Sequence, residues 1–298
     1  MIGEVAGLCA AACWAVGSLL FTRLGKRTSP EAMNLGKCLA AGSLLTITGA
    51  LVGWGDAIST TALLWLLASA IAGLTIGDTA YFGALVRLGM APGLLLLSSA
   101  PVFTALGGWL FLDEALTARD LAGILAVIAG VGLVVTAPST GPSAEPEGRR
   151  RDRLLPGIAL GVIAALGQAS GTLLSKQAMV LGVTPVQAGG LRLLMGGAVL
   201  GVILAIRGRG PRVVGELEAD RTWLRIAGAG MIGSYAGIWL AQIAISRAKT
   251  TGVAATLLAT SPIFALPIAR FAGETIGLRA VLGAVVGVGG VALLTLPA

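Results

Sequence analysis

Three ionisable side chains lie inside long apolar runs of this sequence: Lys37, Asp78 and Arg192. A charge at the centre of a bilayer costs about 2.5–3.5 kcal/mol on insertion scales, so a chain that keeps one usually uses it. Lys37 and Arg192 could act as two cationic gates for a carboxylate or a phosphate. Asp78 could carry a proton or face an amine. In the competing structural interpretation, the cations snorkel to the interface or cap helix carbonyls, and Asp78 pairs with Lys37 or accepts a backbone hydrogen bond.

Aromatic, hydroxyl and amide side chains at helical spacing extend this set, and together they predict a solute pocket at mid-membrane. An interfacial aromatic belt or ordinary packing is the alternative. The candidate pocket residues are Trp14, Ser18, Lys37, Asp78, Tyr81, Gln168, Thr172, Arg192, Tyr235 and Trp239. Pro101 and Pro262 each free one backbone carbonyl within a predicted span, which makes them candidate hinges or static kinks.

Histidine is absent from the chain, which excludes histidine-dependent catalytic triads, HExxH metalloprotease sites and haem ligation by histidine. Cys9, Cys13 and Cys38 fall in apolar segments and are most simply small buried hydrophobic residues. We therefore expect no catalytic residues, no metal site and no cofactor.

The elements that position these residues must be membrane helices. The chain is 56% hydrophobic and 12% charged, whereas a soluble domain carries about 25% charge. A helix needs about 20 apolar residues to cross a bilayer. Ten runs meet this length, and no alternating pattern of a membrane β-barrel occurs. The predicted spans are 3–22, 31–52, 63–85, 92–112, 119–137, 156–176, 186–206, 224–246, 252–271 and 279–297.

The two halves of the chain repeat each other. Residues 7–20 recur as residues 161–174, at an offset of 154, and the glycine pair of 73 and 77 recurs at 233 and 237. Lys37 corresponds to Arg192, whereas Asp78 corresponds to Ile238. We therefore predict a first five-helix repeat over residues 1–137, a polar linker over 138–155 and a second five-helix repeat over 156–298.

Five spans per repeat is an odd number, so the second repeat must enter the membrane upside down. Inverted repeats of this kind provide two mirror conformations, each open to one side of the membrane. Fifteen of the 21 lysines and arginines fall on the side that holds the linker, and four fall on the other side. The positive-inside rule then places the linker in the cytoplasm and both ends of the chain outside.

Several motifs resemble the EamA-type domain of the drug/metabolite transporter superfamily. They run from Ala80 to Pro92, from Ser99 to Phe103 and from Leu112 to Thr117, and the second half repeats them as Thr260–Phe264 and Gly273–Thr275. The resemblance covers almost the whole chain and implies a permease. Glu114 and Glu274 close their spans and are expected to anchor tight turns.

The leading hypothesis is a secondary active transporter in the inner or plasma membrane that moves a small metabolite by alternating access. An amino-acid-like solute and proton coupling through Asp78 are options within this hypothesis. A passive channel or facilitator, a membrane enzyme and a scaffold are the rivals. The expected partners are a solute and membrane lipid, not nucleic acid. The glycines of the Gly283–Gly287 face offer a surface for a homodimer.

Overall fold

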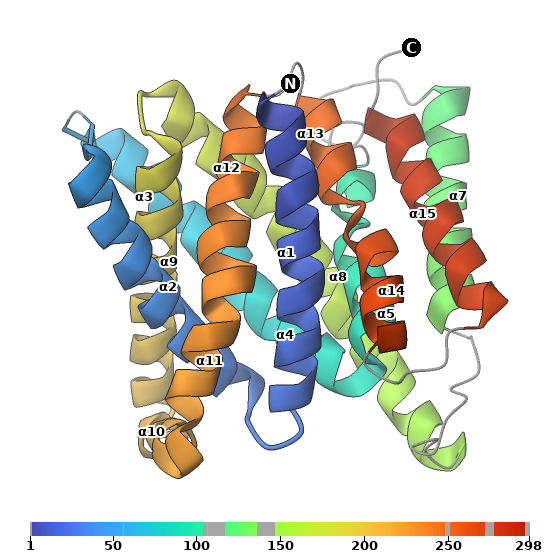
Figure 1. Cartoon of the computed structure of the whole chain (residues 1–298), viewed down its shortest axis with the longest axis horizontal. Coiled ribbons are helices and arrows are strands. Elements are labelled where there is room, and N and C mark those ends of the chain that lie inside the picture. The colour runs from blue at the N-terminus through green and yellow to red at the C-terminus, as the bar shows by residue number, and fades with distance from the viewer. Residues whose placement is uncertain are drawn as a thin grey trace.

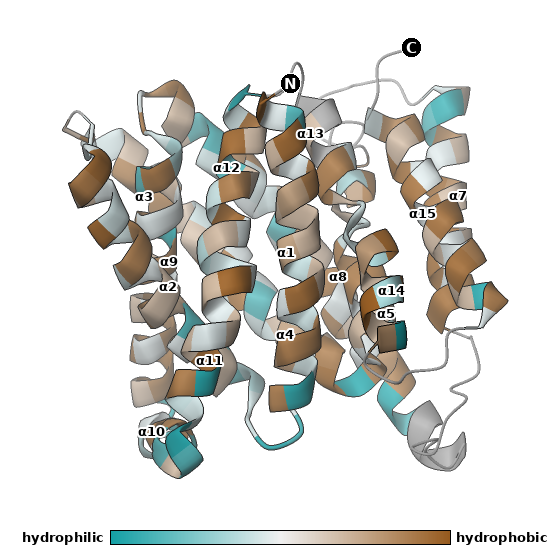
Figure 2. Ribbon diagram, in the orientation of Figure 1, coloured by the Kyte–Doolittle hydropathy of each residue, from teal (hydrophilic) through white to brown (hydrophobic). Residues whose placement is uncertain are grey.

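The computed structural model describes residues 2–55, 57–103, 106, 117–135, 147–247, 251–271 and 277–295, and every regular element in these ranges is a helix. The helices stand side by side as a bundle (Figure 1). Apolar residues cover most of their length, and hydrophilic residues gather at the end that holds α10 (Gly210–Glu218) (Figure 2). The chain is therefore a multi-pass integral membrane protein.

In the described residues, the first half of the chain contains five helical stretches. The third stretch consists of α3, η1 and α4 without a break, and its middle section, η1, is π-helical. The elements are α1 (Ile2–Leu24), α2 (Pro30–Val52), α3 (Thr60–Ser69), the π-helix η1 (Ala70–Asp78), α4 (Thr79–Leu88), α5 (Met90–Leu97) and α7 (Ala118–Val135).

The second half follows the same order and inserts a short amphipathic helix before its third length. The elements are α8 (Glu147–Val180), α9 (Pro185–Ile206), α10, the 3-10 turn η2 (Ala219–Arg221), α11 (Thr222–Gly230), the π-helix η3 (Met231–Ala236), α12 (Gly237–Arg247), α13 (Thr251–Leu258), α14 (Ser261–Phe271) and α15 (Leu278–Thr295).

Local sequence explains why the second helix of each half begins where it does. The side chain of Ser29 caps α2 by accepting from the Ala32 amide, and Pro30 follows at a first-turn position where it loses no helical hydrogen bond. Thr184 caps α9 in the same way within a reciprocal capping box with Gln187.

Within the described residues, eight helical stretches are long and apolar enough to cross a membrane. The fourth and ninth predicted spans differ, because a turn interrupts each. The Ser99 hydroxyl donates to the Leu96 carbonyl at 2.6 Å, and 161 residues later the Thr260 hydroxyl donates to the Leu257 carbonyl at 2.6 Å. Hydroxyl groups that bond backwards compete with helical hydrogen bonds, which explains the break.

Two pairs of helices at equivalent positions in the halves, α2 with α9 and α7 with α15, pack antiparallel. A methyl group added at Gly42 of α2 would lie 3.0 Å from Leu193 of α9, and one added at Gly197 would lie 3.1 Å from Cys38. Residue numbers therefore increase along α2 in the direction in which they decrease along α9, so these two helices run antiparallel. The pair α7 and α15 behaves alike: an added methyl at Gly123 would lie 2.9 Å from the Gly290 carbonyl oxygen, and one at Gly130 would lie 2.6 Å from that of Gly283.

Two expectations need correction. The Gly283–Gly287 face is not available to a second copy of the chain, because Gly283 packs against Gly130 and Gly287 packs against Leu95 of the same chain. Helix α8 begins at Glu147 rather than near residue 156, because a helix continues through the arginine-rich end of the linker and contains Pro156. Glu114, Glu274 and residues 138–146 lie outside the described residues, as does most of the second half of the fourth span.

Candidate functional site

A cavity of about 90 Å³ lies inside the bundle, between elements of both halves. Its lining comes largely in pairs that correspond in the repeat. These pairs are Trp14 with Gln168, Ser18 with Thr172, Lys37 with Arg192, Leu74 with Ser234, Asp78 with Ile238, Tyr81 with Ala241, Phe82 with Gln242, and Leu97 with Leu258. Eight of the ten predicted pocket residues line this one cavity.

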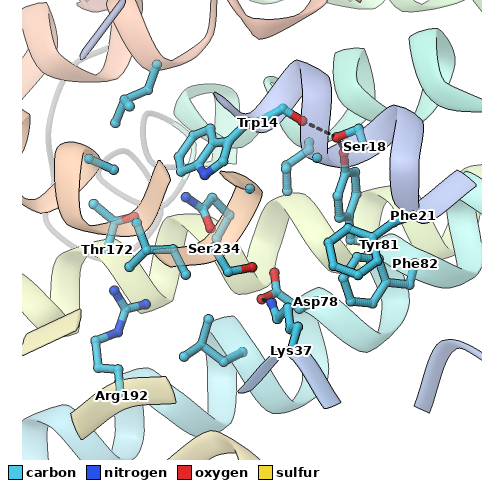
Figure 3. A pocket seen from close by; sticks show the side chains of 18 of the residues that line it. Trp14, Ser18, Phe21, Lys37, Asp78, Tyr81, Phe82, Thr172, Arg192 and Ser234 are labelled. Carbon is cyan, nitrogen blue, oxygen red and sulfur yellow. Dashed lines mark hydrogen bonds and ion pairs between the residues drawn. The ribbon is translucent and has the colours of Figure 1, made fainter. Parts of the chain in front are cut away.

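Although the pairs match in position, they differ in chemistry. The first half supplies an aromatic wall made of Trp14, Phe21, Tyr81 and Phe82. The second half supplies a polar wall made of Gln168, Thr172, Ser234 and Gln242. In Figure 3, Phe21, Tyr81 and Phe82 lie on one side of the cavity, and Thr172 and Arg192 lie on the other.

The two π-helical segments and the glycines beside them bring these walls together. An added methyl at Gly17 of α1 would lie 2.7 Å from the Cα of Gly233 in η3. The corresponding methyl at Gly171 of α8 would lie 2.9 Å from the Cα of Gly73 in η1. Only glycine permits such close backbone crossings. Because π-helical turns are frequent at functional sites, the matching pair makes the cavity a candidate site.

On the first-half side, Lys37 and Asp78 form an ion pair (Figure 3). The Lys37 side chain is 4% exposed and the Asp78 side chain 15% exposed, so Lys37 does not snorkel to the interface. The Lys37 ammonium also lies 5.2 Å from the centre of the Phe82 ring. The ion-pair interpretation of Asp78 is therefore the one that the geometry supports.

On the second-half side, Arg192 has no such partner among the described residues. The residue is 8% exposed, and its Nε atom is buried without a hydrogen bond. Its Nη2 atom lies where Gly73 and Gly171 cross, 3.1 and 3.3 Å from the positions that added methyl groups would take. The missing side chains of these glycines leave room for the guanidinium.

Hydroxyl and amide groups complete the polar contacts of the cavity. The Ser18 hydroxyl donates to the Trp14 carbonyl at 2.6 Å, so Tyr81 must be the donor in its 2.6 Å bond with Ser18. Across the cavity, the Gln242 amide donates to Ser175 at 3.1 Å, while its carbonyl oxygen is buried without a partner.

Comparison with known proteins agrees with this architecture. The EamA-like transporter family matches residues 1–136 and 155–296. The chain belongs to that family. A solved protein crystal structure has the same fold, with a TM-score of 0.66 and 18% sequence identity over 99% of this chain and 96% of the other. None of the curated proteins matches the sequence.

Two predicted pocket residues of this EamA-like chain lie outside the cavity lining. The Thr48 hydroxyl donates to the Leu44 carbonyl, so Tyr235 is the donor in its 2.9 Å bond with Thr48. The Tyr235 ring centre lies 5.9 Å from that of Trp239, with the ring planes tilted by 58°. Both rings pack on the cluster formed by α2 and α9. Tyr235 and Trp239 lie on the neighbouring face of the helix, because the lining residues of this span are Ser234 and Ile238, each one position earlier in the chain. Whether they contact a solute stays a prediction.

The two prolines also lie outside the lining. Pro101 and Pro262 follow the turns at Ser99 and Thr260 and stand at the start of the next helical segment, where a proline disturbs little. Their hinge role stays a prediction.

Sequence reasoning missed Ser234, which is 4% exposed and lines the cavity. A signal for it was present, because Ser234 lies one turn before Ile238, the residue that corresponds to Asp78.

Proposed function

We propose that this EamA-like protein is a secondary active transporter that moves a small solute across the cell membrane by alternating access. The observation that carries the proposal is the cavity: it lies between the two halves, contains charged groups of both, and is lined by corresponding residues. A cavity built at the interface of two repeats is the usual place for a transported solute.

An inverted repeat of ten spans is the architecture that we propose for this cycle. Three features support it: the antiparallel pairing of α2 with α9 and of α7 with α15, the matching π-helices, and the matching turns in the fourth and ninth spans. A two-fold axis perpendicular to the membrane would make the paired helices parallel instead. The contacts between the halves also correspond. Helix α1 of the first half packs on α12, which belongs to the third helix of the second half, and α8 of the second half packs on η1 and α4, which belong to the third helix of the first half.

The moving parts of the proposed cycle are the segments in which the α-helical hydrogen-bond pattern is altered or interrupted. These are η1 and η3, where each π-turn can shift, and the turns before Pro101 and Pro262. Rocking at these points opens the cavity to one side and then to the other.

Coupling to protons uses the Lys37–Asp78 pair in this proposal. Protonation of Asp78 removes its charge and frees the Lys37 ammonium, so the cavity changes charge once per proton. Solute binding and proton binding would then be linked, because both depend on the charge of the cavity.

Reconstitution into liposomes tests the function. Purified protein should accumulate a radiolabelled solute from a mixed panel of small metabolites when a pH gradient is imposed, and preloaded unlabelled solute should accelerate exchange. A passive channel would give flux without such acceleration, and that result would overturn the proposal.

A further inference from the structure

The two cations of the cavity occupy corresponding places but unequal environments. Lys37 has its carboxylate partner in Asp78. The residue that corresponds to Asp78 is Ile238, which also lines the cavity, so Arg192 has an aliphatic side chain where its counter-ion would be. A buried guanidinium without a carboxylate is costly, and a fold that keeps it has a use for an anion there.

The charge of the lining sets the charge of that anion. Lys37 and Asp78 cancel, and Arg192 leaves one positive charge. The Asp78 carboxylate forms its ion pair with Lys37 and not with Arg192. A monoanion neutralises the cavity, whereas a phosphate dianion would reverse its sign.

The rest of the lining sets the shape of the ligand. Arg192 and Thr172 of the polar wall lie on one side of the cavity, and Phe21, Tyr81 and Phe82 of the aromatic wall lie on the other (Figure 3). The buried Gln242 oxygen on the polar wall lacks a hydrogen-bond donor. A cavity of about 90 Å³ holds only a small molecule.

We propose that the solute is a small organic carboxylate with an apolar body: its carboxylate pairs with Arg192, as Asp78 pairs with Lys37, and its apolar part lies against the aromatic wall. A planar guanidinium binds a carboxylate through two parallel hydrogen bonds. This inference rests on the proposed function, because it names the solute class of the same cavity.

The test is binding to the full-length protein in detergent, by thermal shift and calorimetry, without transport. The probes are 3-methylbutanoate, its neutral amide, 3-methylbutylamine and inorganic phosphate. We expect the carboxylate to bind at least about tenfold more tightly than the amide, because charge-assisted bonds are about twice as strong as neutral ones. Tighter binding of the amine or of phosphate, or no binding of the carboxylate, overturns the inference.

Two variants identify the residue responsible. Arg192→Gln should abolish the preference for the carboxylate over the amide. If Arg192 had only a structural role, the ratio of the two affinities would stay unchanged. Ile238→Asp should supply the missing counter-ion within the protein, so it should lose carboxylate binding while its melting temperature holds or rises. Ile238→Asn is the matched neutral control and should keep the preference. A preference that survives Arg192→Gln contradicts the inference.

The two proposals fail in different ways. If liposomes accumulate another solute and carboxylates do not bind, the transport function stands and the inference falls. If carboxylates bind through Arg192 but nothing is transported, the inference stands and the proposed function falls.

Discussion

The two sides of the cavity share a backbone arrangement and differ in side chains. On the first-half side an ammonium and a carboxylate neutralise each other next to aromatic rings. On the second-half side a guanidinium lies beside hydroxyl and amide groups with Ile238 in place of the acid. In the proposed transport cycle, the repeated backbone would supply two equivalent conformations, and the unequal side chains would supply the chemistry of solute binding.

The largest expected effect comes from breaking the pair on the first-half side. Asp78→Asn leaves the Lys37 ammonium buried without a counter-ion, which costs about 3–5 kcal/mol of unfolding free energy. Adding Lys37→Met should recover most of that loss. Thermal unfolding of the single and double variants measures both steps.

Transport separates the coupling role of Asp78 from its structural role. The Asp78→Asn, Lys37→Met double variant should still exchange solute across liposomes but fail to use a pH gradient. A stable Asp78→Asn protein with normal gradient-driven uptake would end the coupling hypothesis.

The second prediction compares the two cations directly. Lys37→Met should destabilise the fold by about 3 kcal/mol or more, because it leaves the Asp78 carboxylate unpaired. Arg192→Met should be nearly neutral or stabilising, since it removes a buried charge and leaves no partner behind. Equal losses in the two variants would show that Arg192 has a counter-ion in the folded protein and that the two sides do not differ as described.

The sequence predicts the helices well because each apolar run is long and several begin at a capping residue, such as Ser29, Ser59 and Thr184. Eight of the ten predicted pocket residues line the cavity, because the repeat places corresponding residues at corresponding depths. The periodicity is assigned to the wrong face in the third span of the second half. The cavity face is Ser234, Ile238 and Ala241, each one position before Tyr235, Trp239 and Gln242, and of the second set only Gln242 lines the cavity.

Pairing across the bundle is also beyond the sequence. Asp78 could have bonded to the backbone or to Lys37, and both are compatible with its position in the chain. The choice depends on how η1 lies against α2 and α8, and the glycine contacts of the η1–α8 crossing appear only in the tertiary structure. The glycine face around Gly283 illustrates the same limit, since its spacing cannot tell an internal partner from a second copy.

The third prediction tests whether the two backbone crossings are equivalent. Gly17→Ala and Gly171→Ala each force a methyl group within 3 Å of a facing Cα, so each should cost about 1–3 kcal/mol. Gly201→Ala is the control, because its methyl would meet no atom within 4 Å. Denaturant unfolding measures all three. A cost at one crossing alone would contradict the equivalence of the two halves.

The smallest effects come from two tyrosines in matched local settings. Each donates to a hydroxyl that in turn donates to the carbonyl four residues earlier: Tyr81 to Ser18, and Tyr235 to Thr48. Removing either phenolic hydroxyl should therefore cost a similar amount, about 0.5–1.5 kcal/mol. Their surroundings differ, because Tyr81 lines the cavity and Tyr235 packs outside its lining. Tyr81→Phe should change the apparent affinity for solute in counterflow, whereas Tyr235→Phe should lower the melting temperature and leave that affinity as it was. A change of affinity in Tyr235→Phe alone would move the solute site away from the cavity between the two walls.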